Sequence, residues 1–368
     1  MKKRKVLIVN NMIGYYGAEN VLVNMVNNMD YSRYDITVLT LLECDSTQLN
    51  NEIHYKYIFR KKNEILHKVK NKLKLILSYK NLAKIYCRGF DIAIAFKMGE
   101  CAHLVSFCNA PKKICWIHSN VTDIPENFSY SFSSIEDEKE CMRKFDILVA
   151  VSHSCANSFT QKYGKSLSII VVYNPIDSKK IHQLSKLDDI LQDDKYLFDG
   201  TIPVLGTIAR IDYQKGIDRL IYISEKLEDL KIKHRMVIIG DGVDFKKYSK
   251  IIQEKKLKSV YLLGFRKNPY AYLIKFRAFI CSSIWESYSL VVNEALVLGI
   301  PVISTKCGGP EEVLQNGKYG ILTENNEEAL FFAVRKFLLS NNFTSENYDG
   351  SDSLNEFIIN INKILEMN

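Results

Sequence analysis

Two glutamates, Glu286 and Glu294, stand in residues 282–313, a stretch otherwise rich in apolar side chains. Charged residues are seldom buried without a partner, so each carboxylate needs a reason to be there. On one continuous helix, eight residues would separate them by roughly 12 Å along the axis. A retaining hydrolase places its two carboxylates about 5 to 5.5 Å apart, and an inverting one about 6.5 to 9.5 Å. The spacing therefore argues against a hydrolytic acid–base pair.

A helix that begins after Glu286 and contains Glu294 is predicted in this stretch. Ser287 or Ser289 is a suitable N-cap, and Gly299 followed by Pro301 is a typical stop, which predicts a helix over 289–298. The free backbone amides at a helix N-terminus bind anions. The turn before this helix is therefore a candidate phosphate site.

The positions of the glutamates relative to this helix suggest a ligand. Glu286 falls at the strand-to-helix turn, and Glu294 one to two turns inside the helix. A sugar nucleotide fits: its phosphates would meet the amides, Glu294 would accept hydrogen bonds from the ribose, and Glu286 from the hexose. The alternative, which the spacing supports equally well, is that Glu294 is a solvated helix position and that Glu286 is an acid stabilised by the helix dipole.

A second pattern, GTIARIDYQKGIDRL, places Arg210 and Lys215 after a strand and before a helix. Two fixed cations at that point can neutralise a diphosphate, because a guanidinium gives a forked contact and an ammonium gives a point charge. The alternative is a pair of exposed loop cations.

Alternating β-branched runs and helical stretches must position these residues. A first series comprises KVLIVN, ITVLTL, DIAIAF, KICWIH, DILVAVS and SIIVVYN. A second comprises PVLGTIA, RMVIIG, SVYLLGF, AFICSS, PVIST and GILT. Alternation of this kind is typical of parallel α/β units, and ligands gather at the carboxyl ends of their strands. We expect two Rossmann-like domains facing across a cleft, over residues 1–175 and 176–350, with a C-terminal helix over 351–368 that packs back on the N-terminal domain.

These motifs resemble family 4 of the retaining glycosyltransferases, which have the GT-B fold. The run E-SYSLVVN-E is similar to the signature of that family, in which seven residues separate two glutamates. GYYGAENVLVNMV resembles its glycine loop and first helix, WIHSN its acceptor-side histidine segment, and VVYNPID its interdomain hinge. ARIDYQKG resembles its diphosphate motif, and IIGDG its following glycine turn.

The resemblance implies roles for individual residues. Arg210 and Lys215 would hold the diphosphate, with the backbone amides of Ser289 and Leu290 at the distal phosphate. Glu294 would bind the ribose and Glu286 the donor hexose, as an orienting group and not a nucleophile. The remaining donor-side positions are the glycine turn at Gly242, the base site at Gly264 and Phe265, and the first loop at Gly14 and Gly17. Family members retain the anomeric configuration, usually by front-face displacement.

For three of these positions a purely structural role is the alternative to ligand binding. His118 ends a strand, so it could polarise the donor or position the acceptor hydroxyl, but a lone histidine is often a packing residue. Gly14 and Gly17 would let backbone approach a ligand, or they only form a tight turn.

The composition limits cofactors and location. Nine cysteines occur without a CxxC pair, which favours packing thiols, and no His, Cys and Asp cluster has ligand spacing, so no metal or other cofactor is expected. A signal peptide is not predicted, because VLIV is too short for an apolar core. The predicted location is cytoplasmic.

A basic segment, Lys56 to Arg88, holds eleven Lys or Arg and one acid, within a chain of net charge +8. Leu66, Val69 and Leu73 lie at helical spacing between its lysines. Such a helix suits the anionic inner face of a membrane; the alternative is a crossover helix with a solvated lysine face. Nucleic acid is not expected as a partner, because a recognition motif is missing.

The predicted function is transfer of a hexose or N-acetylhexosamine from a nucleotide-diphosphate sugar, and a UDP-sugar is the expected donor. The expected acceptor is a lipid-linked saccharide or a surface polysaccharide such as a capsule. One alternative is a sugar-nucleotide epimerase on the same architecture, and another is a non-catalytic module that binds membrane or glycan. A nicotinamide oxidoreductase is disfavoured, since the first strand leads to IGYYGAE and not to G-x-G-x-x-G.

Overall fold

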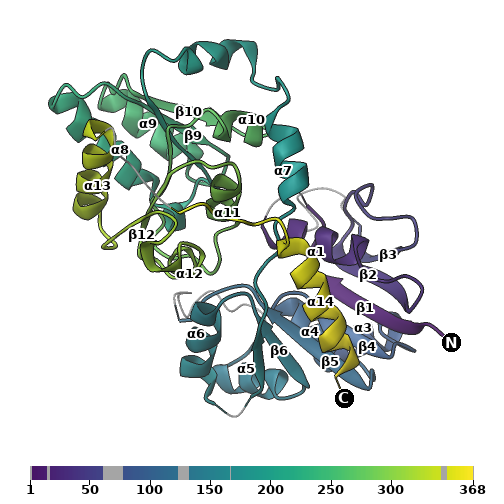
Figure 1. Ribbon diagram of the computed structural model, residues 1–368. Coiled ribbons are helices and arrows are strands. Elements are labelled where there is room, and N and C mark those ends of the chain that lie inside the picture. Colours follow the sequence, from purple (N-terminus) through teal and green to yellow (C-terminus); the bar gives the residue numbers. More distant parts are fainter. Residues whose placement is uncertain are drawn as a thin grey trace. The chain divides into compact units, whose positions relative to one another are not determined.

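The computed structural model describes residues 2–14, 17–60, 78–122, 132–165, 167–340 and 346–367. It divides into two compact units. The first comprises Met1–Pro175 together with Asn355–Asn368, and the second comprises Ile176–Leu354. Each unit contains its own parallel sheet (Figure 1), which confirms the predicted class of two Rossmann-like α/β domains.

The sheet of the first unit has seven strands in the order β3-β2-β1-β4-β5-β6-β7, and every pair is parallel. The strands are β1 (Arg4–Asn10), β2 (Tyr34–Leu42), β3 (His54–Phe59), β4 (Ile92–Ala95), β5 (Lys112–Ile117), β6 (Ile147–Ala150) and β7 (Ile169–Val171). The helices are α1 (Ala18–Asn27), α3 (Tyr79–Tyr86), α4 (Glu100–Ser106), α5 (Ile135–Met142), α6 (His153–Tyr163) and α14 (Ser353–Glu366). The sequence patterns predicted six of these strands, and only β3 was missed.

The C-terminal helix α14 belongs to this first unit from Asn355 onward, as predicted. It buries Phe357, Ile361, Ile364 and Leu365. Lys112 Nζ donates a hydrogen bond to the carbonyl oxygen of Ile364 (2.5 Å) and another to that of Met367, and Arg4 donates to Leu365 (2.8 Å). The last carbonyls of a helix are otherwise unpaired, so these cations complete its C-terminus.

The sheet of the second unit has six parallel strands in the order β10-β9-β8-β11-β12-β13. The strands are β8 (Val204–Ile208), β9 (Arg235–Ile239), β10 (Val260–Gly264), β11 (Ala278–Cys281), β12 (Val302–Thr305) and β13 (Ile321–Thr323). The α-helices are α7 (Ser178–Ser185), α8 (Ile217–Asp229), α9 (Phe245–Glu254), α10 (Tyr270–Leu273), α11 (Leu290–Val297), α12 (Gly309–Val313) and α13 (Glu327–Leu339). Three 3₁₀ turns, η2 (Gln192–Phe198), η3 (Tyr213–Lys215) and η4 (Gln315–Gly317), complete the unit.

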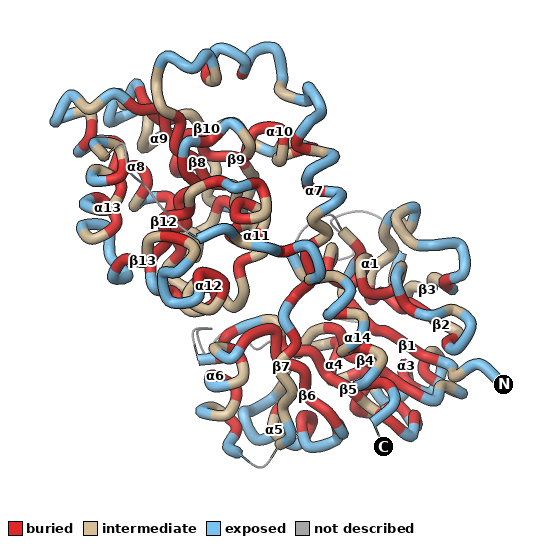
Figure 2. Tube along the Cα trace, in the orientation of Figure 1, coloured by how far each residue is buried: buried red, intermediate tan, exposed pale blue. Residues whose placement is uncertain are grey.

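Two cores lie on opposite faces of this second sheet. Successive strand residues alternate between faces, so on β9 Met236 and Ile238 pack with α8, α9 and α13, whereas Val237 and Ile239 pack with α7, α10 and α11. Both faces of the central strands are therefore buried, as Figure 2 shows, and the apolar runs in the sequence reflect this. Burying each Leu or Ile contributes about 1.5–3 kcal/mol to folding.

The remaining predictions about composition concern cysteines and membranes. All nine cysteines are free thiols, and eight are buried in accord with a packing role. In the described ranges, none of the helices is both long and apolar enough to span a membrane. Residues 61–77 of the basic segment lie outside the described residues. On α3, Lys80 and Lys84 are exposed, while Leu82 and Ala83 pack into the core.

Candidate active site

The loops that follow β8 and β11 are joined at the carboxyl edge of the second sheet, where these two strands are neighbours. The backbone N–H of Ile284 donates to the carbonyl oxygen of Gln214 (2.8 Å), and Gln214 Nε2 donates to that of Trp285 (2.9 Å). Ser282 Oγ donates to the carbonyl oxygen of Lys215 (2.8 Å). These bonds hold the residues of the two predicted motifs in one place.

Lys215 and Glu286 form an ion pair at this junction. Lys215 Nζ lies 2.5 Å from Glu286 Oε1, and the two side chains are only 17% and 11% exposed. Ser283 Oγ donates a second hydrogen bond to the same carboxylate oxygen (3.0 Å). Burial lowers the pKa of Lys215, but the charge and hydrogen bond of Glu286 outweigh it and raise that pKa above its ordinary value. Lys215 is therefore a fixed cation.

Gly216 explains how Lys215 comes so close to the neighbouring loop. Its φ is +59°, a left-handed conformation, and a Cβ at this position would lie 2.2 Å from the carbonyl oxygen of Ser282. A larger residue would push the two loops apart.

The backbone of Glu286 is held from its other side by the loop after β12. Its N–H donates to the carbonyl oxygen of Cys307 (2.7 Å), and its own carbonyl accepts from the N–H of Gly309 (2.8 Å). A Cβ on Gly309 would lie 2.5 Å from Tyr288 Cα, so the two loops pack backbone against backbone. Gly309 thus helps to fix the position of Glu286.

Helix α11 forms where the sequence predicted a helix with an anion site at its N-terminus. It spans Leu290–Val297, within one residue at each end of the predicted 289–298, and Ser289 is its N-cap. Within the described residues, the Ser289 side chain caps none of the helix amides. The first N–H groups of an α-helix lack partners inside the helix and carry its positive dipole end. The amides of Ser289 and Leu290 lie at this terminus, as the phosphate role requires.

Glu294 lies one turn into α11 and is half-buried as a residue. The Tyr270 hydroxyl donates a hydrogen bond to Glu294 Oε1 (3.0 Å). Burial raises the pKa of Glu294 to about 7, although the Tyr270 hydrogen bond opposes this shift. The carboxyl group is therefore not freely solvated, and it has no ion-pair partner among the residues that the structure describes. Tyr270 gave no signal in the sequence.

Arg210 differs from Lys215 in exposure. Its side chain is 65% exposed, its Nε donates to Asp212 Oδ2, and its second terminal nitrogen donates to Gln214 Oε1 (3.3 Å). The second predicted cation is thus a long side chain at the surface. Its guanidinium is paired with the Asp212 carboxylate, and an anionic ligand would have to take the place of that carboxylate.

The remaining predicted site residues of the second unit lie in the glycine turn after β9 and at the end of β10. A Cβ on Gly242 would lie 2.3 Å from the carbonyl oxygen of Ile211, so packing between loops already explains a glycine there. Gly264 ends β10 with φ +77°, and the next residue, Phe265, is 51% exposed. Both lie at the same sheet edge as Lys215.

His118, Gly14 and Gly17 lie in the first unit, just after the ends of β5 and β1. Gly17 is the N-cap of α1 with φ +55°. A Cβ on Gly14 would make an ordinary 3.6 Å contact with Glu19. Glu19 in turn pairs with Lys97, which follows β4. The Lys97–Glu19 pair was not predicted from the sequence.

The His118 ring packs against Phe96 at 4.9 Å between centroids and makes a hydrogen bond with the Phe96 backbone. Burial, and then the charge of Lys97, lower the pKa of His118 to about 3, so the imidazole is neutral at pH 7. Among the described residues, its buried Nε2 has no hydrogen-bond partner. A neutral ring that donates through its other nitrogen presents a lone pair at Nε2, which can accept a hydrogen bond from a hydroxyl.

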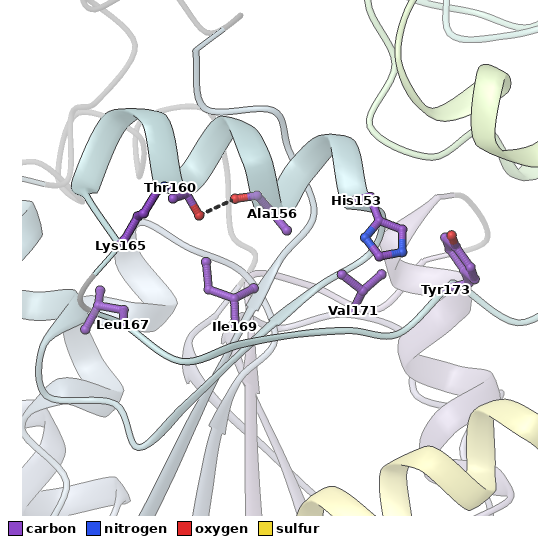
Figure 3. A pocket seen from close by; sticks show the side chains of 8 residues that line it. All are labelled: His153, Ala156, Thr160, Lys165, Leu167, Ile169, Val171 and Tyr173. Atoms are coloured by element: carbon purple, nitrogen blue, oxygen red, sulfur yellow. Dashed lines mark hydrogen bonds between the residues drawn. The ribbon is translucent and has the colours of Figure 1, made fainter.

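A cavity of about 640 Å³ lies elsewhere in the first unit, between α6 and the edge strand β7 (Figure 3). It is lined by His153, Ala156, Thr160, Lys165, Leu167, Ile169, Val171 and Tyr173. The Thr160 hydroxyl is already bonded to the Ala156 carbonyl (2.8 Å), and the strand contributes apolar side chains. Polar groups do not converge on this cavity as they do on Glu286, and the predicted site residues do not line it. We therefore place the candidate site at the sheet edge.

A metal centre was not expected. Across the described ranges, no group of three or more His, Cys, Asp and Glu side chains is arranged to hold an ion.

Solved structures identify the architecture. HepE from Anabaena, crystallised with UDP and glucose, superposes with a TM-score of 0.79 at 19% identity, and the match covers 99% of this chain and 100% of HepE. Sucrose-phosphate synthase from Thermosynechococcus elongatus gives a TM-score of 0.77 at 12% identity, covering 99% and 98% of the two chains. The fold is that of the GT-B glycosyltransferases.

Sequence comparisons give the family. The family model described as Glycosyltransferase Family 4 matches residues 15–180, and the one described as Glycosyl transferases group 1 matches residues 188–349. Together the two models cover most of the chain. The chain belongs to family 4 of the glycosyltransferases, which confirms the resemblance seen in its motifs.

Two curated relatives are more similar in sequence than these structures. An uncharacterized glycosyltransferase of Methanocaldococcus jannaschii is 31% identical over 233 residues, covering 59% of this chain and 57% of the relative. A Campylobacter jejuni enzyme is 30% identical over 200 residues, covering 53% and 51%. Its name is N-acetylgalactosamine-N,N'-diacetylbacillosaminyl-diphospho-undecaprenol 4-alpha-N-acetylgalactosaminyltransferase. The matched part spans about half the length of each relative.

Proposed function

We propose that this chain transfers a hexose or N-acetylhexosamine from a UDP-sugar to a lipid-linked or surface polysaccharide acceptor, with retention of the anomeric configuration and without a metal ion. The observation that carries the proposal is the Lys215–Glu286 ion pair beside the N-terminus of α11. A fixed cation and the amides at a helix N-terminus can bind the phosphates of a nucleotide-diphosphate sugar, and a neighbouring carboxylate can accept hydrogen bonds from its hexose.

The donor contacts follow from these positions. Lys215 and the amides of Ser289 and Leu290 would bind the distal phosphate, and Arg210 would exchange Asp212 for the diphosphate. Glu294 would accept hydrogen bonds from the ribose, with the base beside Gly264 and Phe265. We take UDP as the first nucleotide to test, because the structural neighbour HepE was crystallised with UDP.

Departure of the diphosphate is the step that most needs stabilisation. As the bond from the anomeric carbon to the diphosphate oxygen breaks, negative charge accumulates on the leaving group, and preorganised cations and amides stabilise it. The acceptor hydroxyl attacks from the same face, and its proton passes to the departing diphosphate. Glu286 orients the hexose; its carboxylate is engaged by Lys215 and Ser283, which suits an orienting group better than a nucleophile.

The acceptor and location complete the proposal. The name of the Campylobacter jejuni relative includes a diphospho-undecaprenol acceptor, which makes a lipid-linked saccharide the first class to test. We place the protein at the inner face of the cell membrane, held by the basic segment 56–88.

The experiment that tests this proposal is a transfer assay with UDP-hexoses and UDP-N-acetylhexosamines, run in EDTA and again with magnesium. The expected result is release of one UDP for each glycoside formed, equal rates in both buffers, and an NMR coupling that shows a retained anomeric configuration. Interconversion of donor sugars without UDP release would support the epimerase alternative instead. An inverted product would refute the retaining mechanism.

A further inference from the structure

Two aromatic side chains, those of Tyr213 and Trp285, lie close together beside the candidate active site. Tyr213 is 60% exposed, and Trp285 is partly exposed. Their ring centroids lie 6.0 Å apart at an angle of 58°. Two neighbouring aromatic rings present a larger apolar surface than a single exposed side chain, and their polar tips can still form hydrogen bonds.

These two rings are fixed to the groups that would do the chemistry. Tyr213 begins the 3₁₀ turn η3 that ends at Lys215, and Trp285 immediately precedes Glu286. The hydrogen bond from Gln214 Nε2 to the Trp285 carbonyl (2.9 Å) ties the two loops together. The two rings, here called the platform, therefore lie on the same two loops as the Lys215–Glu286 ion pair.

The platform is much more exposed than Glu286, the predicted contact of the donor hexose. Glu286 is only 8% exposed, whereas Tyr213 is 60% exposed. A donor hexose held at Glu286 would occupy the inner position, which leaves the rings for the next group out. The group next to the donor sugar in a transfer reaction is the acceptor.

The chemistry of the platform matches a sugar ring. One face of a pyranose is lined by C–H groups that can cover an aromatic ring, while its hydroxyls project from the edge toward polar partners. A polar group is adjacent: Asp212 binds Arg210 through Oδ2, and its Oδ1 is buried and has no hydrogen-bond partner among the described residues. If Arg210 turns to the diphosphate, the Asp212 carboxylate is left to accept from a hydroxyl.

We propose that Tyr213 and Trp285 form an acceptor subsite that binds a pyranose ring of the saccharide acceptor, with Asp212 accepting a hydrogen bond from one of its hydroxyls. This inference rests on the proposed function, because it needs a donor sugar at Glu286. It adds the residues that would recognise the acceptor.

Kinetics test the subsite through the variants Tyr213→Ala and Trp285→Ala. Methyl glycosides of glucose, galactose, N-acetylglucosamine and N-acetylgalactosamine serve as acceptors. We expect the acceptor KM to rise about tenfold or more, with UDP affinity unchanged and kcat at saturating acceptor within about twofold. Tyr213→Phe keeps the ring and should keep the KM. Tyr196→Ala is the matched control, since Tyr196 is similarly exposed (57%) and also pairs with another ring, that of Tyr261.

Fluorescence provides a readout that does not depend on turnover. The chain has two tryptophans, and Trp116 is fully buried in the first unit, so a saccharide-dependent change that disappears in Trp285→Phe reports on Trp285 alone. Unchanged acceptor KM in both alanine variants would overturn the inference, as would a loss of UDP affinity, which would make the rings a base site. A change in Trp285 fluorescence without transfer would keep the subsite and refute the proposed function; neither fluorescence change nor transfer with any of the four glycosides would refute the subsite.

Discussion

The affinity of the protein for UDP should depend on pH through Glu294. Burial raises the pKa of this carboxyl group to about 7. Only the ionised form has the full acceptor capacity to bind two ribose hydroxyls, because a protonated carboxyl carries a proton on one oxygen. Binding should therefore strengthen as pH rises through 7, whereas an ordinary glutamate would already be ionised at pH 6.

The size of the effect follows from the titration. With a pKa of about 7, roughly 9% of the carboxyl groups are ionised at pH 6 and roughly 91% at pH 8. If only the carboxylate binds ribose well, the dissociation constant for UDP should fall about tenfold between these two values, equivalent to about 1.4 kcal/mol.

Calorimetric titrations with UDP between pH 5.5 and 8.5 would measure this dependence. The terminal phosphate of UDP also titrates in this range, so Glu294→Gln is the matched control: it keeps the ligand's own titration and removes the contribution of the carboxyl group. Tyr270→Phe gives a second check. Its hydroxyl donates to Glu294 Oε1 (3.0 Å) and opposes the raised pKa, so its loss should move the midpoint to higher pH.

Identical pH profiles for the parent protein and Glu294→Gln would refute this reasoning. A midpoint that stays in place in Tyr270→Phe would show that the hydroxyl does not control the ionisation of Glu294.

Three further predictions concern stability and membrane binding. Lys215→Met should lower the free energy of unfolding in urea by about 3 kcal/mol, because Glu286 stays buried without its partner; Lys215→Met with Glu286→Gln should regain most of that loss but no transfer, and an additive loss would argue against the ion pair. Lys112→Met should speed proteolysis within α14, whereas Arg33→Ala should not, since the Arg33–Glu366 pair is about half exposed; equal rates in both variants would contradict the role of Lys112. Changing four lysines of the basic segment to Gln should release the protein from anionic vesicles and leave UDP affinity unchanged; retention on the vesicles would refute the membrane prediction. The four are Lys68, Lys70, Lys72 and Lys74.

The positions of most strands along the chain and the class of fold were predictable because the signals involved are local. A buried parallel strand is a short β-branched run, and the stop at Gly299 and Pro301 ends α11 within one residue of its predicted end. The missed strand β3 shows the limit of the rule. It is an edge strand with mostly half-exposed residues, HYKYIF, so its sequence lacks an apolar run.

The site was predictable as a set of residues but not as a set of contacts. Lys215 and Glu286 are 71 residues apart, and only the adjacency of β8 and β11 brings them together. The raised pKa of Glu294 depends on burial and on Tyr270, which belongs to a separate helix. Gly242 was assigned to donor binding, and the structure adds a packing reason, close approach to Ile211, that a single glycine in a sequence cannot reveal.

The measurement that tests the account most directly is a metal-free calorimetric titration of the purified protein with UDP, GDP and ADP, repeated for Arg210→Ala combined with Lys215→Ala. The account predicts that UDP binds in EDTA, that GDP and ADP bind far more weakly, and that the double variant loses UDP. Absence of binding by all three nucleotides, or UDP affinity that survives loss of both cations, would contradict the proposed donor site.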